Sequence, residues 1–176
     1  MTIKELRNLI VSGLSGYLGI PVALANQVNP EPEFPFVIYS FTAAYIPENG
    51  LGDYSDIERE DRFQEIRKEE PTCTMSFTVC SVDRKTKEGF ILGDDEALEL
   101  AEKATGWFLH VGYEDLSRRG ATVVDVSNIQ DRSTLMVDEE ARRQGFDVTI
   151  RYVRQDAREI QAIDREKLMI KEGDAQ

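Results

Sequence analysis

Residues 72–82 show the cleanest alternation of apolar and polar side chains in the chain, and this pattern constrains the fold more than any other part of the sequence. The apolar positions are Cys73, Met75, Phe77 and Val79. The polar positions that alternate with them are Thr72, Thr74, Ser76 and Thr78. Successive side chains of a strand point to opposite faces of the sheet. We therefore predict a half-buried strand, with one face in the core and the other facing solvent or a partner.

Four further stretches have the composition of strands. Residues 34–46 are rich in aromatic and β-branched side chains, which favour strands. Within residues 143–154, apolar side chains such as Phe146 again alternate with polar ones. Shorter runs lie near residues 121–128 and 132–138. Together with the first stretch, these patterns predict five strands.

Two stretches have the periodicity of amphipathic helices. The first begins after Thr2, which stands in capping-box spacing with Glu5, and it ends at a pair of glycines. The second covers about residues 95–111, with Asp94 or Asp95 as its N-terminal cap. The order of helix, strands, helix and strands predicts an α+β fold, in which two helices pack on a mostly antiparallel β-sheet.

Residues 47–70 interrupt this order with turn-forming and charged residues. From Asp53 to Glu70 the chain has eight acidic residues against four basic ones, which does not fit a core strand. We predict a single domain at residues 1–154, from which residues 47–70 protrude as an acidic hairpin or mobile loop. Residues 155–176 form a charged C-terminal arm, either a marginal helix or a segment ordered by a neighbour.

The charge of the chain bears on nucleic-acid binding. With 21 basic and 33 acidic residues, the net charge is −12, whereas proteins that grip DNA have a basic face. No apolar run approaches the roughly 20 residues of a membrane span, and the first residues do not fit a signal peptide. We therefore expect neither specific DNA binding nor a membrane location.

Motifs for catalysis or cofactor binding are absent from the sequence. The single histidine, His110, excludes a His-rich metal site, and its spacing from Cys73 and Cys80 fits no usual zinc pattern. No glycine-rich phosphate loop and no nucleophile elbow is present. A cluster of carboxylates is the best candidate for divalent metal: Asp53, Asp56, Glu58, Glu60 and Asp61. These carboxylates fall in a turn-rich stretch, so we expect a solvated loop, with no catalytic residue, metal or cofactor.

Several stretches resemble the phage neck and tail terminator family: GIPVALANQVNPEPEFPFVIYSF, AAYIPENG, EALELAEKATGWFLHVGYEDL and VVDVSNIQDRSTLMVDEEARRQGFDVTIR. Together they span about residues 1–154, and VSNIQDR and GFDV are the more distinctive pieces. The chain differs from the family pattern around residues 56–69 and after Arg154. The resemblance implies a tail-terminator-like fold without an active site.

The resemblance also implies a role in the virion. Such a subunit forms a ring, expected to be a hexamer, that caps the tail tube protein and joins the tail to the head connector or head-closure protein. DNA passes through the ring without specific binding. The protein would be present in the host cytoplasm during assembly and at the head–tail junction afterwards.

Ten residues are candidate assembly contacts, which lie in or next to the protruding loop, at arginine positions or in the C-terminal arm. They are Tyr45, Glu48, Leu51, Tyr54, Asp56, Arg142, Arg143, Arg151, Ile160 and Ile163. Two other functions remain open from the sequence. One is a head-closure or head–tail adaptor protein, and the other is a small metal-dependent phage nuclease that uses the acidic loop.

Overall fold

The computed structural model describes residues 1–27, 32–48, 50–59, 62–87, 89–133 and 141–160, and of residues 58, 59, 62 and 63 only the backbone. The helical segments are α1 (Ile3–Leu18), α2 (Gly93–Gly106), a π-helical turn η1 (Trp107–Val111) and α3 (Tyr113–Arg118). The first strands are β1 (Val22–Leu24), β2 (Phe36–Ile46), β3 (Asp53–Arg59), β4 (Arg62–Glu69) and β5 (Thr72–Ser81). The others are β6 (Arg84–Lys85), β7 (Phe90–Ile91), β8 (Ala121–Val126), β9 (Gln130–Asp131), β10 (Arg142–Tyr152) and β11 (Arg154–Ile160).

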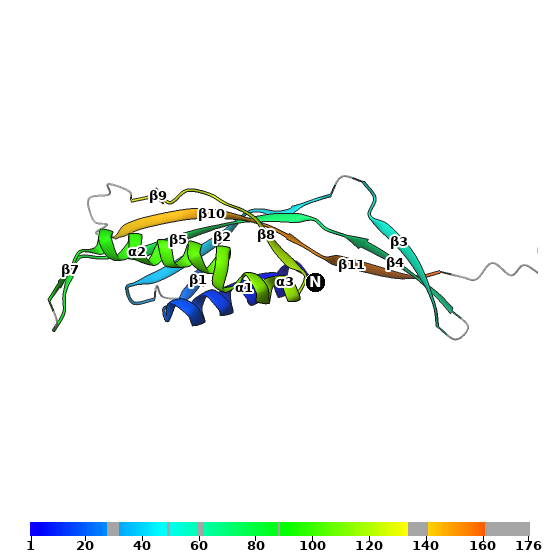
Figure 1. Cartoon of the computed structure of the whole chain (residues 1–176), viewed down its shortest axis with the longest axis horizontal. Helices are drawn as coiled ribbons and strands as arrows, with labels where there is room; N and C mark the ends of the chain where they lie inside the picture. The colour runs from blue at the N-terminus through cyan, green and yellow to red at the C-terminus, as the bar shows by residue number, and fades with distance from the viewer. Residues whose placement is uncertain (28–31, 49, 60–61, 88, 134–140, 161–176) are drawn as a thin grey trace, which may run out of the picture.

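The main sheet has the order β1-β2-β5-β10-β8, with β9 paired to one end of β10. Only β1 and β2 run parallel, and the other pairs are antiparallel. The helices lie together along one face of this sheet (Figure 1). The predicted α+β fold is confirmed, with the difference that the short helix α3 follows the second helix.

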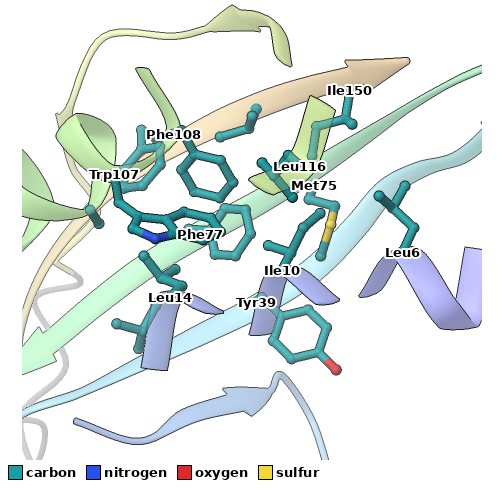
Figure 2. Packing of buried hydrophobic residues seen from close by; sticks show 14 of the residues in the cluster. Leu6, Ile10, Leu14, Tyr39, Met75, Phe77, Trp107, Phe108, Leu116 and Ile150 are labelled. Atoms are coloured by element: carbon teal, nitrogen blue, oxygen red, sulfur yellow. The ribbon is translucent and has the colours of Figure 1, made fainter. Parts of the chain in front are cut away.

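The core lies between the helices and the main sheet (Figure 2). The predicted alternation in β5 is confirmed, since Cys73, Met75, Phe77 and Val79 are fully buried in this core. The Phe77 ring lies at the centre, with its centroid 5.1 Å from that of Phe108. The polar side chains between them lie on the opposite face of the sheet, which the helices leave uncovered.

The predicted N-terminal cap is present in α1 and is wrong in α2. Thr2 caps α1 through the predicted capping box with Glu5. The predicted cap of α2 by Asp94 or Asp95 is wrong, because the helix already begins at Gly93. There, the backbone N–H of Gly93 donates to the Asp83 carboxylate at 2.7 Å. A side chain from the preceding loop thus supplies the acceptor that the helix start needs.

A second sheet of three strands, β11-β4-β3, projects beyond the end of the main sheet (Figure 1). Strand β5 follows β4 after only two residues, and β11 follows β10 after only Val153. The chain of β5 and that of β10 in the main sheet therefore each continue into the second sheet, as β4 and β11. We call this second sheet the projecting sheet. Residues 53–59 and 62–69 pair as an antiparallel hairpin.

The structure differs from the prediction in the C-terminal arm, and it describes little of the predicted strand at residues 132–138. A marginal helix in the C-terminal arm is wrong for residues 155–160, which form strand β11 because their backbone pairs with β4. Residues 161–176 lie outside the described residues. The predicted strand at residues 132–138 also falls largely outside them, and strand β9 ends just before it, at Asp131.

Candidate functional site

Within the part of the chain that the structure describes, no group of three or more His, Cys, Asp or Glu side chains could hold a metal ion. His110 is exposed, and both cysteines are buried and form no disulfide with each other. Burial raises the pKa of the Cys73 thiol to about 11, so this thiol stays protonated at neutral pH and is a poor metal ligand or nucleophile. Of the acidic candidates, Glu60 and Asp61 lie outside the described residues.

A densely bonded polar group lies where the projecting sheet leaves the main sheet. The side chain of Glu69, at the end of β4, is only 2% exposed. Tyr45 donates to its two carboxylate oxygens at 3.1 and 3.0 Å, and Arg67 donates to it at 2.5 Å. Arg154 completes the group, with its guanidinium 3.4 Å from the carboxylate and 5.4 Å from the centroid of the Tyr45 ring. We call these four residues the joint.

The joint ties together the ends of three strands. Tyr45 comes from β2, Glu69 from β4 and Arg154 from β11. The hydrogen bond to Glu69 raises the pKa of the Arg67 guanidinium above its ordinary value. Hydrogen bonds between charged partners are stronger than neutral ones and fix geometry. The joint therefore holds the projecting sheet in one direction relative to the main sheet.

Beyond the joint, the projecting sheet is held by its backbone ladder and by ion pairs. Arg67 and Arg154 both pair with Asp156, at 3.4 and 3.1 Å. Arg158 of β11 pairs with Glu65 of β4 at 2.5 Å. None of the side chains that the structure describes in β3, β4 and β11 belongs to the hydrophobic core. A three-stranded sheet without a packed apolar face gains little stability of its own.

We expect Glu69→Gln to loosen the projecting sheet and to leave the main core intact. The neutral amide keeps the size of the side chain but removes the charge that two guanidinium groups share, at a cost of about 1–2 kcal/mol. Hydrogen exchange of the β4 and β11 amides should speed up by roughly tenfold, whereas that of β5 should not change.

Glu65→Gln is the matched control for this measurement. It removes the same charge from the same strand, but its partner Arg158 has a side chain that is 71% exposed. An exposed ion pair contributes between about 0 and 1 kcal/mol. Equal exchange rates in the two variants would show that the joint does not fix the projecting sheet.

Most of the predicted contact residues gather around the projecting sheet. Tyr45 belongs to the joint, Glu48 accepts a hydrogen bond from the Glu70 backbone, and the carbonyl of Leu51 accepts one from Arg67. Tyr54 and Asp56 are exposed on β3. Of the rest, Arg151 lies 3.7 Å from Glu70 at the end of β10, and Ile160 ends β11.

The structure does not bring the other predicted residues to this region. Arg142 and Arg143 begin β10, at the end of the main sheet opposite to the projecting sheet. At about 3.4 Å per residue, the length of β10 separates them from Arg151 by roughly 30 Å. Ile163 lies outside the described residues.

Sequence reasoning missed a second polar cluster, on the uncovered face of the main sheet. Arg132 donates to Ser76 at 2.6 Å, to Thr78 at 3.1 Å and to Asp147 at 3.0 Å. Its side chain crosses Gly145, where an added Cβ would lie 2.6 Å from Arg132 Cδ. A glycine inside a strand pattern was the available signal, since it marks a close approach by another group.

Among the helices of the described residues, none is long and apolar enough to cross a membrane. A comparison with curated proteins finds no match for this sequence. A family model described as phage neck terminator protein matches residues 3–173, which is nearly the whole chain. The chain therefore belongs to the phage neck terminator protein family.

Proposed function

We propose that this protein is a structural subunit of the phage neck that assembles into a ring of six copies. The ring caps the tail tube protein, ends tail growth and joins the tail to the head connector or head-closure protein. In this proposal residues 1–154 form the domain, residues 155–176 extend from it as a contact segment, and the ten predicted contact residues serve in assembly.

The observation that carries the proposal is the projecting sheet. It extends past the helix-covered part of the molecule, none of its described side chains belongs to the hydrophobic core, and the joint around the buried Glu69 carboxylate fixes its direction (Figure 1). A rigid, uncovered sheet presents backbone edges and side chains on both faces, which supports a role in binding another protein. Membership of the neck terminator family supports placing that contact at the end of the tail.

The net charge supports a ring through which DNA slides. Six copies would carry six times −12, or −72 charges. Where some of these acids line the channel, repulsion from the DNA phosphates keeps the passage free of tight binding. The same charge opposes the meeting of free copies, so assembly before contact with a tail is weak.

The proposal predicts that cells infected with a phage that lacks this protein produce tails of irregular, excess length, and that these tails do not join heads. The purified protein, added to tails from such an infection, should bind at the head-proximal end and restore joining, as seen by electron microscopy. Light scattering coupled to size exclusion should show larger assemblies as protein and salt rise together, since salt shortens the Debye length to about 8 Å at physiological strength.

Three outcomes would favour another function. Density on isolated heads and none on isolated tails would indicate a head-closure or adaptor protein. DNA cleavage with Mg²⁺ that Asp56→Ala removes would indicate a nuclease. A stable twofold dimer at every concentration, without density at the tail end, would exclude the terminator role.

A further inference from the structure

Two opposite sides of the molecule end in strand edges that have no partner among the described residues. On one side, β1 is the last strand of the main sheet and β3 is the last strand of the projecting sheet. On the other side, the main sheet ends at β8. Because β4 continues into β5 and β11 follows β10, strand β3 lies on the same side of β4 as β2 does of β5. The open edges of β3 and β8 therefore face away from each other.

Exposed apolar side chains accompany both edges. Along β1, β3 and the turn just before β3 they are Leu24, Leu51, Tyr54 and Ile57, which we call the β3 side. Next to β8, on η1, the start of α3 and β8 itself, they are Leu109, Val111, Tyr113 and Val124, which we call the β8 side. Leu51 is 77% exposed and Leu109 64%. Unpaired edges flanked by exposed apolar side chains are surfaces on which other strands and side chains dock.

We propose that the β8 side of one copy binds the β3 side of the next copy, and that this head-to-tail contact builds the ring. Two different patches that face opposite ways give a heterologous contact, which leaves one free patch at each end until the ring closes. A twofold contact would instead need one patch that binds itself. This inference rests on the proposed function only for the number of copies, since the contact itself concerns two copies of the chain.

The charges of the two sides fit this assignment. Strand β3 carries the exposed acids Asp53 and Asp56, whereas the end of α3 beside β8 carries Arg118 and Arg119. Both arginines pair within α3, Arg118 with Glu114 at 2.9 Å and Arg119 with Asp115 at 3.4 Å. These i,i+4 pairs are exposed and each contributes little stability, so the arginines can turn to the acids of a neighbour's β3. In a chain of net charge −12, such local pairing directs which sides of two copies meet.

The test uses two double variants of the full chain that block one side each. Leu51→Asp with Ile57→Asp blocks the β3 side, and Leu109→Asp with Val124→Asp blocks the β8 side. Each variant alone should lose self-association, with an apparent Kd raised by about 100-fold or more. Mixed together, they should form a one-to-one dimer and nothing larger, because only one intact pair of sides remains. Sedimentation velocity measures both results across protein concentration.

Phe90→Asp with Leu98→Asp is the control, since it adds the same two charges at exposed apolar positions on neither side. This control should associate as the wild type does, and circular dichroism should show that all three variants are folded. A mixture of the two blocked variants that stays monomeric would overturn the proposal, as would a wild-type chain that is monomeric at every concentration and salt. Unchanged association of either blocked variant would do the same.

The result is separable from the proposed function. Complementation of the blocked variants in solution, together with no effect of the protein on tails, would support the contact and exclude the terminator role. Capping of tails by the wild type without complementation would leave the terminator role in place and overturn the contact, with the tail tube protein then occupying these sides.

Discussion

Removing the projecting sheet is expected to abolish tail capping and to leave the rest of the chain folded. Ile46 and Thr72 face each other at the ends of β2 and β5, so residues 47–70 can be replaced by Asn-Gly to give a short hairpin loop. Pro71 stays, because its carbonyl accepts the Tyr152 N–H at 3.0 Å. The shortened chain ends after Val153, which removes the partner strand β11.

The physical reason is that the hydrophobic core includes none of the side chains described in β3, β4 and β11. The melting temperature should therefore stay within a few degrees of the full chain, since each kcal/mol shifts it by about 2–4 °C in a protein of this size. Electron microscopy of tails should show no cap and irregular tail length. Glu65→Gln in the full chain, which perturbs only an exposed ion pair, should cap normally.

Either of two results would contradict this prediction. An unfolded shortened chain would show that the projecting sheet belongs to the cooperative core. A shortened chain that folds and still caps tails would show that the contact with the tail lies elsewhere, for example on the polar face around Arg132.

The elements that sequence reasoning found are those with one buried face. In β5 and β10, every second side chain enters the core, so hydrophobic alternation in the sequence predicts both strands. The capping box of α1 is a local pattern of four residues, and it is present as predicted. The cap of α2 was missed because its acceptor, Asp83, lies in the loop before the helix and reaches it only in the folded chain.

The sequences of the strands in the projecting sheet show no hydrophobic alternation. One face of this sheet carries the row of Tyr54, Arg67 and Asp156, and the opposite face carries the pair of Asp53 and Lys68. Since neither face is buried in the main core, charges occupy both faces and the alternation disappears. Their net acidity predicted a protrusion, but the pairing of β11 with β4 depends on residues that are about 90 positions apart in the sequence.

The candidate contact residues show the same division. Exposed apolar and aromatic residues of the loop, such as Leu51 and Tyr54, could be selected from composition alone. Glu69 could not, because one buried carboxylate among eight acids of that stretch looks like any other until its partners are placed. Tyr45 stays a predicted contact: its hydroxyl is bonded to Glu69 within the joint, and its side chain is 42% exposed.

Gly112→Ala is expected to destabilise the core by about 3 kcal/mol, although it adds only one methyl group. Gly112 has φ −86 and ψ −11, which any residue can adopt, so the cost comes from packing and not from the backbone. An added Cβ would lie 2.4 Å from Trp107 Cε2, and the same indole already lies against Gly13, where a Cβ would be 2.6 Å from Cζ2. The Trp107 side chain, buried beside Phe108, cannot move away without disturbing the aromatic core (Figure 2).

Gly106→Ala is the matched control, six residues earlier in the same helical segment. A Cβ there meets nothing within 4 Å, and φ −59 is helical, so alanine should stabilise the chain by up to about 1 kcal/mol. The melting temperature should therefore fall by about 6–12 °C for Gly112→Ala and rise slightly for Gly106→Ala. Trp107 is the only tryptophan of the chain, so its fluorescence reports unfolding and repacking at this site directly. Equal shifts in the two variants would show that helix propensity, and not the contact with Trp107, decides the stability here.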